Sequence, residues 1–370
     1  MKNYFGYLRS LNNLGTLLSQ KEICELCRQQ SMHQLNFKIP TAGGQLFWET
    51  INLKNWKIQK NLLTGHIRIL SKNNIRLSYG SEEQVLAPFL RKINENLKQS
   101  SVKDKSWGIV FSGGGAKGAF QIGVWKYLNE NGISQKITGV SGSSVGALNC
   151  LLFANGSYEK AEKIWLAMKQ KDMTTLSHKF LSNKAIFSLK KIENLMKTEV
   201  DWDKIKSTDK ILYSTLSSVT LPHVPKTKLL NISNIVTNPE YFCWSNCSAD
   251  EIQKIILASA AIPLFYQPRS ITNRLYIDGG WSDNIPANPL IKAGFSNIIV
   301  VHLDRESRKE HEIWKKSISG IESNKTKFYH IYPSKDFDDS ILAIAKINPI
   351  LTKSRMEAGC KAASKFINLS

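Results

Sequence analysis

A short stretch around Ser144 combines a nucleophilic side chain with the spacing that a tight turn requires. Gly142 and Gly146 lie two residues before and two residues after it, which fits the pattern G-x-S-x-G. Residues 137–140 predict a strand before the serine, and residues 145–153 predict a helix after it. A serine on such a strand-to-helix turn has a strained backbone and an exposed hydroxyl. Ser144 is therefore the candidate nucleophile for an acyl transfer reaction.

Two neighbouring serines are rivals for this role. Ser141 has no glycine two residues after it, and Ser143 has none on either side at that spacing. Because the neighbouring backbone approaches a nucleophile elbow closely, both flanking positions must be small. The steric requirement favours Ser144.

A carboxylate that could activate a serine stands at the end of a later predicted strand. Asp278 follows residues 274–277, and the two glycines after it leave it uncrowded. An exposed aspartate has a pKa near about 3.9 and is a weak base, whereas burial raises the pKa and makes a better one. Asp283 is a rival that lacks the glycine pair. We take Asp278 as the candidate general base.

The glycine-rich loop at residues 113–118, Gly-Gly-Gly-Ala-Lys-Gly, has several interpretations. It matches the dinucleotide fingerprint, but the next predicted strand does not end in the carboxylate that binds the ribose. It is not a Walker loop, because Ala119 stands where lysine should follow the last glycine. Successive N–H groups at a helix start instead suit the oxyanion of a tetrahedral intermediate. The candidate oxyanion-hole residues are Gly113, Gly114, Gly115 and Lys117; a purely structural glycine turn is the alternative.

Strands and helices alternate along the chain from Trp107. The predicted strands are 108–112, 137–140, 210–216, 228–235, 274–277 and 297–303, and the predicted helices are 119–131, 145–153, 158–170, 184–198, 249–260 and 353–367. This alternation is typical of a mainly parallel α/β sheet with helices on both faces.

The first hundred residues predict a separate, small α+β unit. Leucines spaced by three and four make residues 1–35 look helical, residues 65–79 alternate as a β-hairpin, and residues 82–98 predict a helix. A polar linker follows at residues 98–105. We expect an accessory unit at 1–100 and a catalytic domain at 107–370.

The three motifs, in this order and context, resemble those of the patatin-like phospholipase family. The similar segments are Gly113-Gly-Gly-Ala-Lys-Gly, Gly142-Ser-Ser-Val-Gly-Ala-Leu-Asn and Asp278-Gly-Gly, with Ser259-Ala-Ala-Ile-Pro upstream of the aspartate. The resemblance covers about residues 107–370. It implies a three-layer α/β/α sandwich and metal-free, phospholipase A-type cleavage of phospholipid esters. It also implies that Ser144 and Asp278 form a dyad that proceeds through an acyl-serine.

Three alternatives stay open. A Ser-His-Asp esterase of broader substrate range would need a histidine after Asp278, and His302, His311 and His330 qualify by chain order alone. A non-catalytic lipid-binding module would not require serine, aspartate and glycines together. A nicotinamide-dependent enzyme lacks the ribose-binding acid.

The composition limits cofactors and partners. A formal charge of +20, from 50 basic and 30 acidic residues, favours polyanions, but no nucleic-acid motif accompanies it. We expect an acyl-lipid substrate, no nucleic acid and, as an option, peripheral contact with anionic membranes. Six cysteines, including Cys24-x-x-Cys27 and the pair Cys243 and Cys247, indicate no disulfide framework, metal site or other cofactor.

No leader or membrane-spanning segment is predicted, so we expect a cytoplasmic protein unless a dedicated system exports it. The basic, amphipathic segment 180–196 has two interpretations. It is either a helix that lies in a membrane interface or an ordinary core-packed helix with a solvated face of lysines. The second interpretation is favoured.

Overall fold

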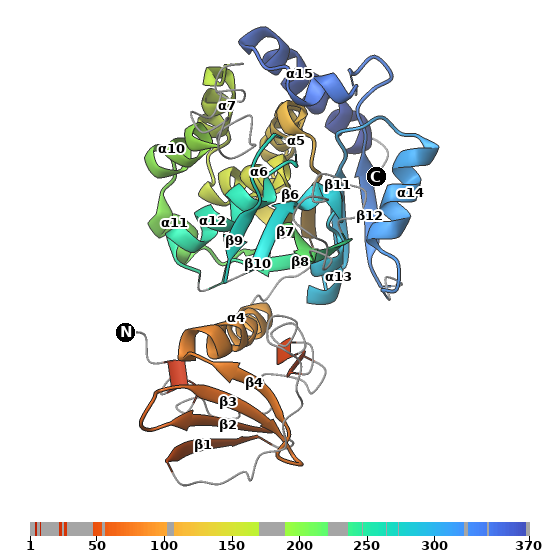
Figure 1. Cartoon of the computed structure of the whole chain (residues 1–370). Helices are drawn as coiled ribbons and strands as arrows, with labels where there is room; N and C mark the ends of the chain where they lie inside the picture. The colour runs from red at the N-terminus through yellow and green to blue at the C-terminus, as the bar shows by residue number, and fades with distance from the viewer. Residues whose placement is uncertain are drawn as a thin grey trace. The chain divides into compact units, whose positions relative to one another are not determined.

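The chain forms two compact units, Met1–Ser101 and Val102–Ser370 (Figure 1). The computed structural model describes residues 4–5, 8, 22–23, 26–27, 47–53, 56–101, 107–169, 189–220, 236–245, 247–263, 265–272, 274–321, 325–338 and 340–367.

In the described part of the first unit, an antiparallel sheet packs against helix α4. Its strands pair in chain order and are β1 (Trp48–Leu53), β2 (Trp56–Asn61), β3 (Ile67–Ser71) and β4 (Arg76–Gly80). Helix α4 (Glu82–Ser101) packs Leu86, Phe89 and Ile93 against Ile58 and Ile69 of the sheet. The predicted hairpin and helix are confirmed, whereas the predicted helical segment 1–35 lies mostly outside the described residues. Strands β1 and β2 were not predicted.

The second unit is built on an eight-stranded sheet in the order β12-β11-β5-β6-β7-β10-β9, with β8 also paired to β7. The five strands from β12 to β7 are parallel, and β8, β9 and β10 pair antiparallel. The strands are β5 (Trp107–Phe111), β6 (Ile137–Ser143), β7 (Ile211–Thr220), β8 (Val236–Cys243), β9 (Arg269–Ile271), β10 (Arg274–Asp278), β11 (Asn297–Val301) and β12 (Lys327–Ile331).

Helices connect these strands. They are α5 (Ala119–Glu130), α6 (Val145–Asn155), α7 (Tyr158–Ala167), α10 (Lys190–Glu199), α11 (Trp202–Ser207), α12 (Ala249–Ser259), α13 (Asn288–Ala293), α14 (Arg308–Ser317) and α15 (Pro349–Ile367), with short 3-10 turns η1 (Gly115–Gly118), η2 (Ser134–Lys136), η5 (Gly279–Trp281) and η6 (Ile341–Ile344).

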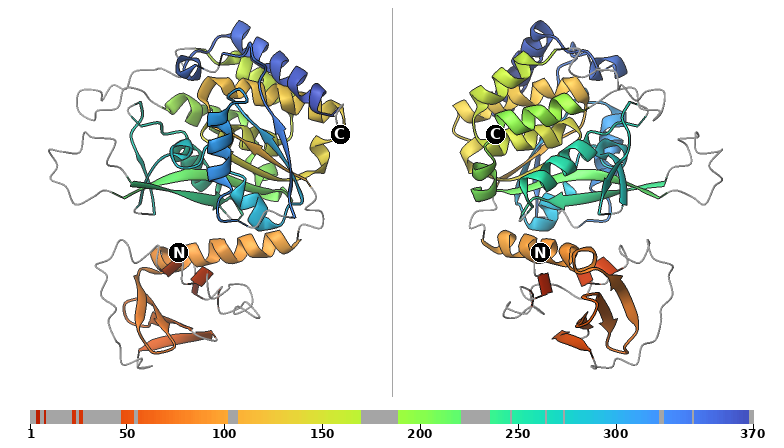
Figure 2. Two further views of the ribbon diagram at one scale, coloured as in Figure 1. Left: turned by 90° about the vertical axis from the view of Figure 1, so that its right-hand side faces the viewer. Right: turned by 60° about the vertical axis from the view of Figure 1, so that its left-hand side comes forward.

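Alternating side chains of the buried strands divide the unit into three layers. Ile109 and Phe111 of β5 face a core formed with α5, α6, α7, α12 and α15. Val110, between them, faces a second core formed with α13 and with Trp314 of α14. Figure 2 shows α15 lying along α5 on the first side. The predicted three-layer α/β/α fold with a mainly parallel sheet is confirmed.

The basic segment packs as an ordinary surface helix where it is described. In α10, Met196 is fully buried in the core, and Ile192 and Leu195 pack against the same core. Lys190, Lys191 and Lys197 are exposed. Residues 180–188 of this segment lie outside the described residues, as does the predicted strand 228–235. Met196 therefore packs into the core, and Ile192 and Leu195 are half-buried against it.

Within the residues that the structure describes, no helix combines the length and apolar character needed to cross a membrane.

Candidate functional site

The register of the sheet brings Ser144 and Asp278 together. Strand β6 pairs with β7 up to Ser143 opposite Thr215, and β10 ends with Asp278 opposite Leu216. Strand β8 occupies the other edge of β7, so β6 and β10 share one edge and their carboxyl ends meet on consecutive β7 residues. Because the two carboxyl ends meet, Ser144 and Asp278 lie side by side although they are 134 positions apart in the chain.

Ser144 lies on a strained turn between β6 and α6. Its φ of 55° and ψ of −124° are unusual for a residue with a side chain. A Cβ on Gly146 would lie 2.0 Å from the Phe111 carbonyl oxygen, and one on Gly142 would lie 2.3 Å from the Gly146 carbonyl oxygen. The two flanking glycines are thus required by close backbone contact, as the sequence pattern predicted.

Ser259, the last residue of α12, holds this turn from the other side. Its Oγ accepts a hydrogen bond of 2.9 Å from the Ser144 N–H and donates one of 2.7 Å to the Thr215 carbonyl. Ser259 is fully buried. The side chain therefore joins α12 and β7 to the nucleophile turn, and it also occupies the Ser144 N–H.

The Ser144 hydroxyl donates a hydrogen bond of 2.5 Å to Asp278 Oδ2. The other carboxylate oxygen accepts the Gly280 N–H at 2.8 Å. Burial raises the pKa of the Asp278 carboxyl to about 7, although the hydrogen bonds from Ser144 and Gly280 oppose the shift by stabilising the ionised form. A buried carboxylate with this pKa is well suited to remove a proton near neutral pH.

The neighbouring rivals do not share this geometry. The Oγ atoms of Ser141 and Ser143 are buried and have no hydrogen-bond partner in the described part of the chain. Asp283 lines the same pocket, but its carboxylate accepts hydrogen bonds from the Tyr241 hydroxyl at 2.7 Å and from the Ile285 N–H at 3.2 Å.

The glycine loop lines the same pocket as Ser144, and its residues differ in whether their N–H groups can still donate a hydrogen bond. The Gly113 N–H already bonds the Asn284 carbonyl at 3.1 Å, and the Asn284 side chain returns a hydrogen bond to the Gly113 carbonyl. The Lys117 ammonium is ion-paired with Asp304. The Gly114 and Gly115 N–H groups have no acceptor among the described residues. They are the loop donors left for a substrate oxygen.

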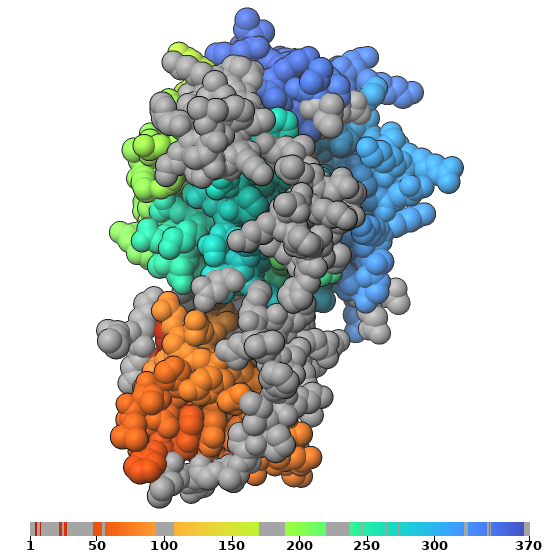
Figure 3. All heavy atoms as spheres, in the orientation of Figure 1, coloured from red at the N-terminus to blue at the C-terminus, as the bar shows by residue number. Residues whose placement is uncertain are grey.

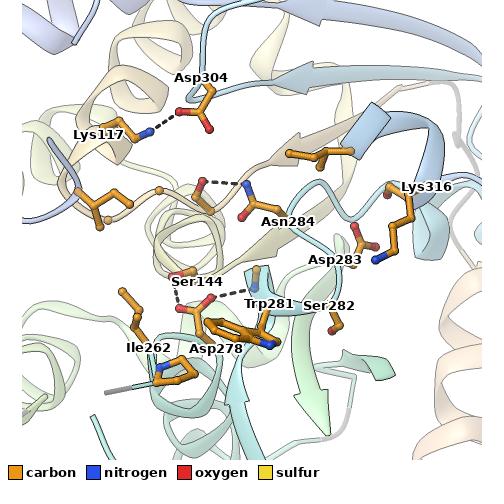
Figure 4. Close-up of a pocket in the computed structure, with 18 residues that line it drawn as sticks. Lys117, Ser144, Ile262, Asp278, Trp281, Ser282, Asp283, Asn284, Asp304 and Lys316 are labelled. Carbon is orange, nitrogen blue, oxygen red and sulfur yellow. Dashed lines mark hydrogen bonds and ion pairs between the residues drawn. The ribbon is translucent and has the colours of Figure 1, made fainter. Parts of the chain in front are cut away.

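One cavity of about 360 Å³ is lined by Ser144, Asp278 and the glycine-loop residues Gly113, Gly114, Gly115 and Lys117. Figure 4 shows Ser144 and Asp278 at one end, beside Ile262 and Trp281, with Lys316 at the other end. Trp281 is 47% exposed, which places an apolar surface at the pocket mouth. A cavity of this size can enclose part of a lipid-sized ligand.

The structure also shows pocket residues that the sequence did not single out, among them Asn284, Trp281, Asp304 and Lys316. Ser259 and Asn284 fall within segments already noticed beside the aspartate. No pattern of spacing marked their contacts, because each bonds a residue more than a hundred positions away.

The three histidines that follow Asp278 lie elsewhere. The Nδ1 of His302 lies 2.7 Å from Glu310 Oε1, and its Nε2 lies 2.9 Å from Nδ1 of His330. Burial lowers the pKa of His302 to about 3. His311 contacts Glu306. None of the three lines the pocket, and both His302 nitrogens already have partners. This geometry does not form the Ser-His-Asp triad that chain order permitted.

Replacing His302 by alanine should leave ester hydrolysis within about threefold of wild type per folded molecule. The buried contacts with Glu310 and His330 would be lost, so the melting temperature should fall, since an unpaired buried polar group costs about 1–3 kcal/mol. Activity and thermal unfolding measured on one preparation test this. An enzyme as inactive as the Ser144→Ala variant would require a triad instead.

In the stretches of the chain that the structure describes, no group of three His, Cys, Asp or Glu side chains is arranged to hold a metal ion. Cys24 lies outside these stretches. Cys27, Cys243 and Cys247 are buried.

The family described as patatin-like phospholipase has a model that matches residues 109–291. Among curated proteins, no sequence matches the chain. Among solved structures, VipD from Legionella pneumophila is 12% identical with a TM-score of 0.34, over 92% of this chain and 72% of that one. ExoU, in the ExoU-SpcU complex of Pseudomonas aeruginosa, is 13% identical with a TM-score of 0.33, over 91% and 59%. Over residues 109–291, which include Ser144, Asp278 and the glycine loop, the chain belongs to the patatin-like phospholipase family.

Proposed function

We propose that the chain is a phospholipid acyl hydrolase that uses Ser144 as nucleophile and Asp278 as general base. Family membership supports lipid hydrolysis as the activity. The observation that carries the finer proposal is the hydrogen bond of 2.5 Å between the Ser144 hydroxyl and a buried aspartate, inside the pocket.

The reaction would proceed in two steps. Asp278 removes the Ser144 proton as Oγ attacks the ester carbonyl, and the N–H groups of Gly114 and Gly115 stabilise the oxyanion. Collapse of the intermediate breaks the acyl–oxygen bond, and the proton on Asp278 passes to the leaving alcohol. Asp278 then removes a proton from water as the water attacks the acyl-serine, which forms a second oxyanion. Its collapse breaks the bond between Ser144 Oγ and the acyl carbon, the proton on Asp278 returns to Oγ, and the fatty acid is released.

The walls of the pocket fit the two ends of a phospholipid. Ile262, Pro263 and Trp281 offer an apolar surface beside the nucleophile, suited to an acyl chain. Lys316 lines the opposite wall, and its positive charge acts on the carboxylate of Asp283 in the same pocket. A cation there suits the phosphate of a head group better than a neutral glyceride.

Product analysis tests the proposal directly. Wild type and the Ser144→Ala variant are incubated with vesicles of mixed phospholipids that also contain a neutral diacylglycerol, and the products are separated by mass spectrometry. We expect lysophospholipid and free fatty acid from the wild type alone, with little loss of the diacylglycerol. A wild type that binds vesicles and releases no fatty acid would instead be a lipid-binding module.

The proposed chemistry needs no metal, so dialysis against EDTA should leave the rate within about 20% of the untreated value, because proton transfer and oxyanion binding use side-chain and backbone groups alone. Steady-state rates before and after dialysis, with and without added Ca²⁺, are the measurement. A rate lost in EDTA and restored by Ca²⁺ would contradict the dyad mechanism.

The role of residues 1–100 is a separate proposal from that of the pocket. The described residues that line the pocket belong to Val102–Ser370. We propose that the first unit affects where or when the enzyme acts.

A further inference from the structure

Arg355 of α15 is a buried cation whose hydrogen bonds, in the described part of the chain, all go to backbone carbonyls. It is 3% exposed, and the charge of Asp338 stabilises its ionised form without a direct hydrogen bond. Its Nη1 donates to the carbonyls of Ala116 at 2.9 Å and Lys346 at 2.8 Å, and Nη2 donates to that of Ala343 at 3.0 Å. An arginine stays charged in such a site, so these carbonyls must replace its hydration.

The three carbonyls belong to two segments that are far apart in the sequence. Ala116 lies in the middle of the glycine loop, and Ala343 and Lys346 lie in and just after η6. The segments touch beside the nucleophile: a Cβ on Gly115 would lie 2.4 Å from the Ile344 carbonyl oxygen, and Ile344 lines the pocket. One guanidinium therefore fastens both sides of this contact.

The loop needs an external support of this kind. Glycines have wide backbone freedom, and Gly115 adopts a left-handed φ of 57°. An oxyanion hole works only if its donors are already oriented when charge develops, because reorientation would add to the barrier. The Asn284 contacts fix Gly113 at one end of the loop, and the Arg355 contact fixes Ala116 at the other. Gly114 and Gly115 lie between these two anchors.

We propose that Arg355 is a positioning residue that holds the Gly114 and Gly115 N–H groups in the orientation that binds the oxyanion. The inference rests on the proposed hydrolase function. Arg355 itself does not line the pocket. In the space-filling view α15 forms the upper surface of its unit (Figure 3), and Arg355 is almost fully buried.

The test uses Arg355→Met, which keeps most of the side-chain volume and removes every donor, and Arg355→Lys, which keeps the charge and loses the fork. Both are assayed on a soluble short-chain ester at a temperature where circular dichroism shows them folded. We expect Arg355→Met to lower kcat at least about tenfold with KM within about twofold, since the oxyanion forms after substrate binds. Arg355→Lys should recover part of the loss.

A transition-state analogue separates positioning from simple stabilisation of the fold. The Ser144 hydroxyl oxygen adds to the carbonyl of a trifluoromethyl ketone, and the resulting oxyanion lies against the glycine loop. The inhibition constant of this ketone should rise by about the same factor as kcat/KM falls, because both report binding of the oxyanion. Met356→Ala is the matched control: Met356 is the next residue of α15 and packs in the core. This variant should melt lower yet keep kcat and inhibitor affinity.

The outcomes are distinguishable. Wild-type kcat and inhibitor affinity in folded Arg355→Met would overturn the inference, as would an equal loss of kcat in Met356→Ala. If Arg355→Met does not fold, the decision falls to Arg355→Lys, in which an unchanged kcat overturns the inference. If the wild type cleaves no ester at all, the proposed function fails instead.

Discussion

Replacing Ser144 by alanine, or Asp278 by asparagine, should lower ester hydrolysis by at least about 10³-fold, because the nucleophile and its base act as one unit. Alanine leaves no oxygen to acylate. Asparagine keeps the shape of the aspartate but cannot accept the proton of the hydroxyl that now lies 2.5 Å away. Initial rates on a soluble ester and on phospholipid vesicles measure the effect, and the double variant should be no worse than either single one.

A matched control separates chemistry from disturbance of the turn. Ser143→Ala removes the hydroxyl of the preceding residue, which is fully buried and makes no hydrogen bond to any described group. We expect this variant to keep at least half of the wild-type rate. More than a few per cent of activity in Ser144→Ala, or an inactive Ser143→Ala, would contradict the assignment of Ser144 as the nucleophile.

Both dyad variants should remain folded. The pKa of Asp278 is higher in the folded protein than its usual value of 3.8, so between that value and about pH 7 stability falls as pH rises. The ionised carboxylate therefore costs stability at pH 8, and the neutral amide of Asp278→Asn avoids this cost. A melting temperature no lower than that of the wild type is expected.

The sequence predicted the sharp turn at Ser144 well because local sterics determine it. At this sharp turn from strand to helix, Gly142 and Gly146 are needed because a Cβ at either position would contact neighbouring backbone. The whole requirement falls within a pattern of five consecutive residues. The position of Asp278 beside Ser144 could not be predicted in the same way. It depends on the register of β10 and β6 along one edge of β7, and no local pattern contains that register.

Two of the elements that were not predicted, α14 and β12, have weak hydrophobic patterns. Helix α14 reads Arg-Lys-Glu-His-Glu-Ile-Trp-Lys-Lys-Ser, and Trp314 is its one large apolar side chain that is buried. Strand β12 has a buried Ile331 and four partly or fully exposed residues, since it is the edge of the sheet. Elements of this kind are held by their neighbours rather than by their own periodicity. The same holds for Arg355, whose three acceptors are chosen by the fold.

The pH dependence of hydrolysis should report the ionisation of Asp278. Only the ionised carboxylate can accept the Ser144 proton, and its pKa is about 7. We therefore expect kcat/KM to be constant above about pH 8 and to fall about tenfold per pH unit below 7, so that at pH 5 roughly one molecule in a hundred is active. Rates on an uncharged soluble ester between pH 5 and 9 give the curve.

The ionisation of Glu310 and an acid-induced loss of stability occur in the same pH range, and both can be distinguished from the ionisation of Asp278. Burial also raises the pKa of Glu310 to about 7, but Glu310 contacts His302 and does not line the pocket. Glu310→Gln should therefore keep the apparent pKa of the rate. His302 and His330 are buried with lowered pKa values, so stability falls as the pH drops below the ordinary histidine value of 6.5.

A pH jump distinguishes this loss of stability from titration. Enzyme held at pH 5 and returned to pH 8 should recover its full rate if only a carboxyl was protonated, and circular dichroism at pH 5 should remain native. A rate that is flat from pH 5 to 8 would mean that Asp278 is ionised throughout that range or is not the base. An apparent pKa that disappears in Glu310→Gln would instead assign the titration to the Glu310–His302 pair, and Asp278 would then need another role.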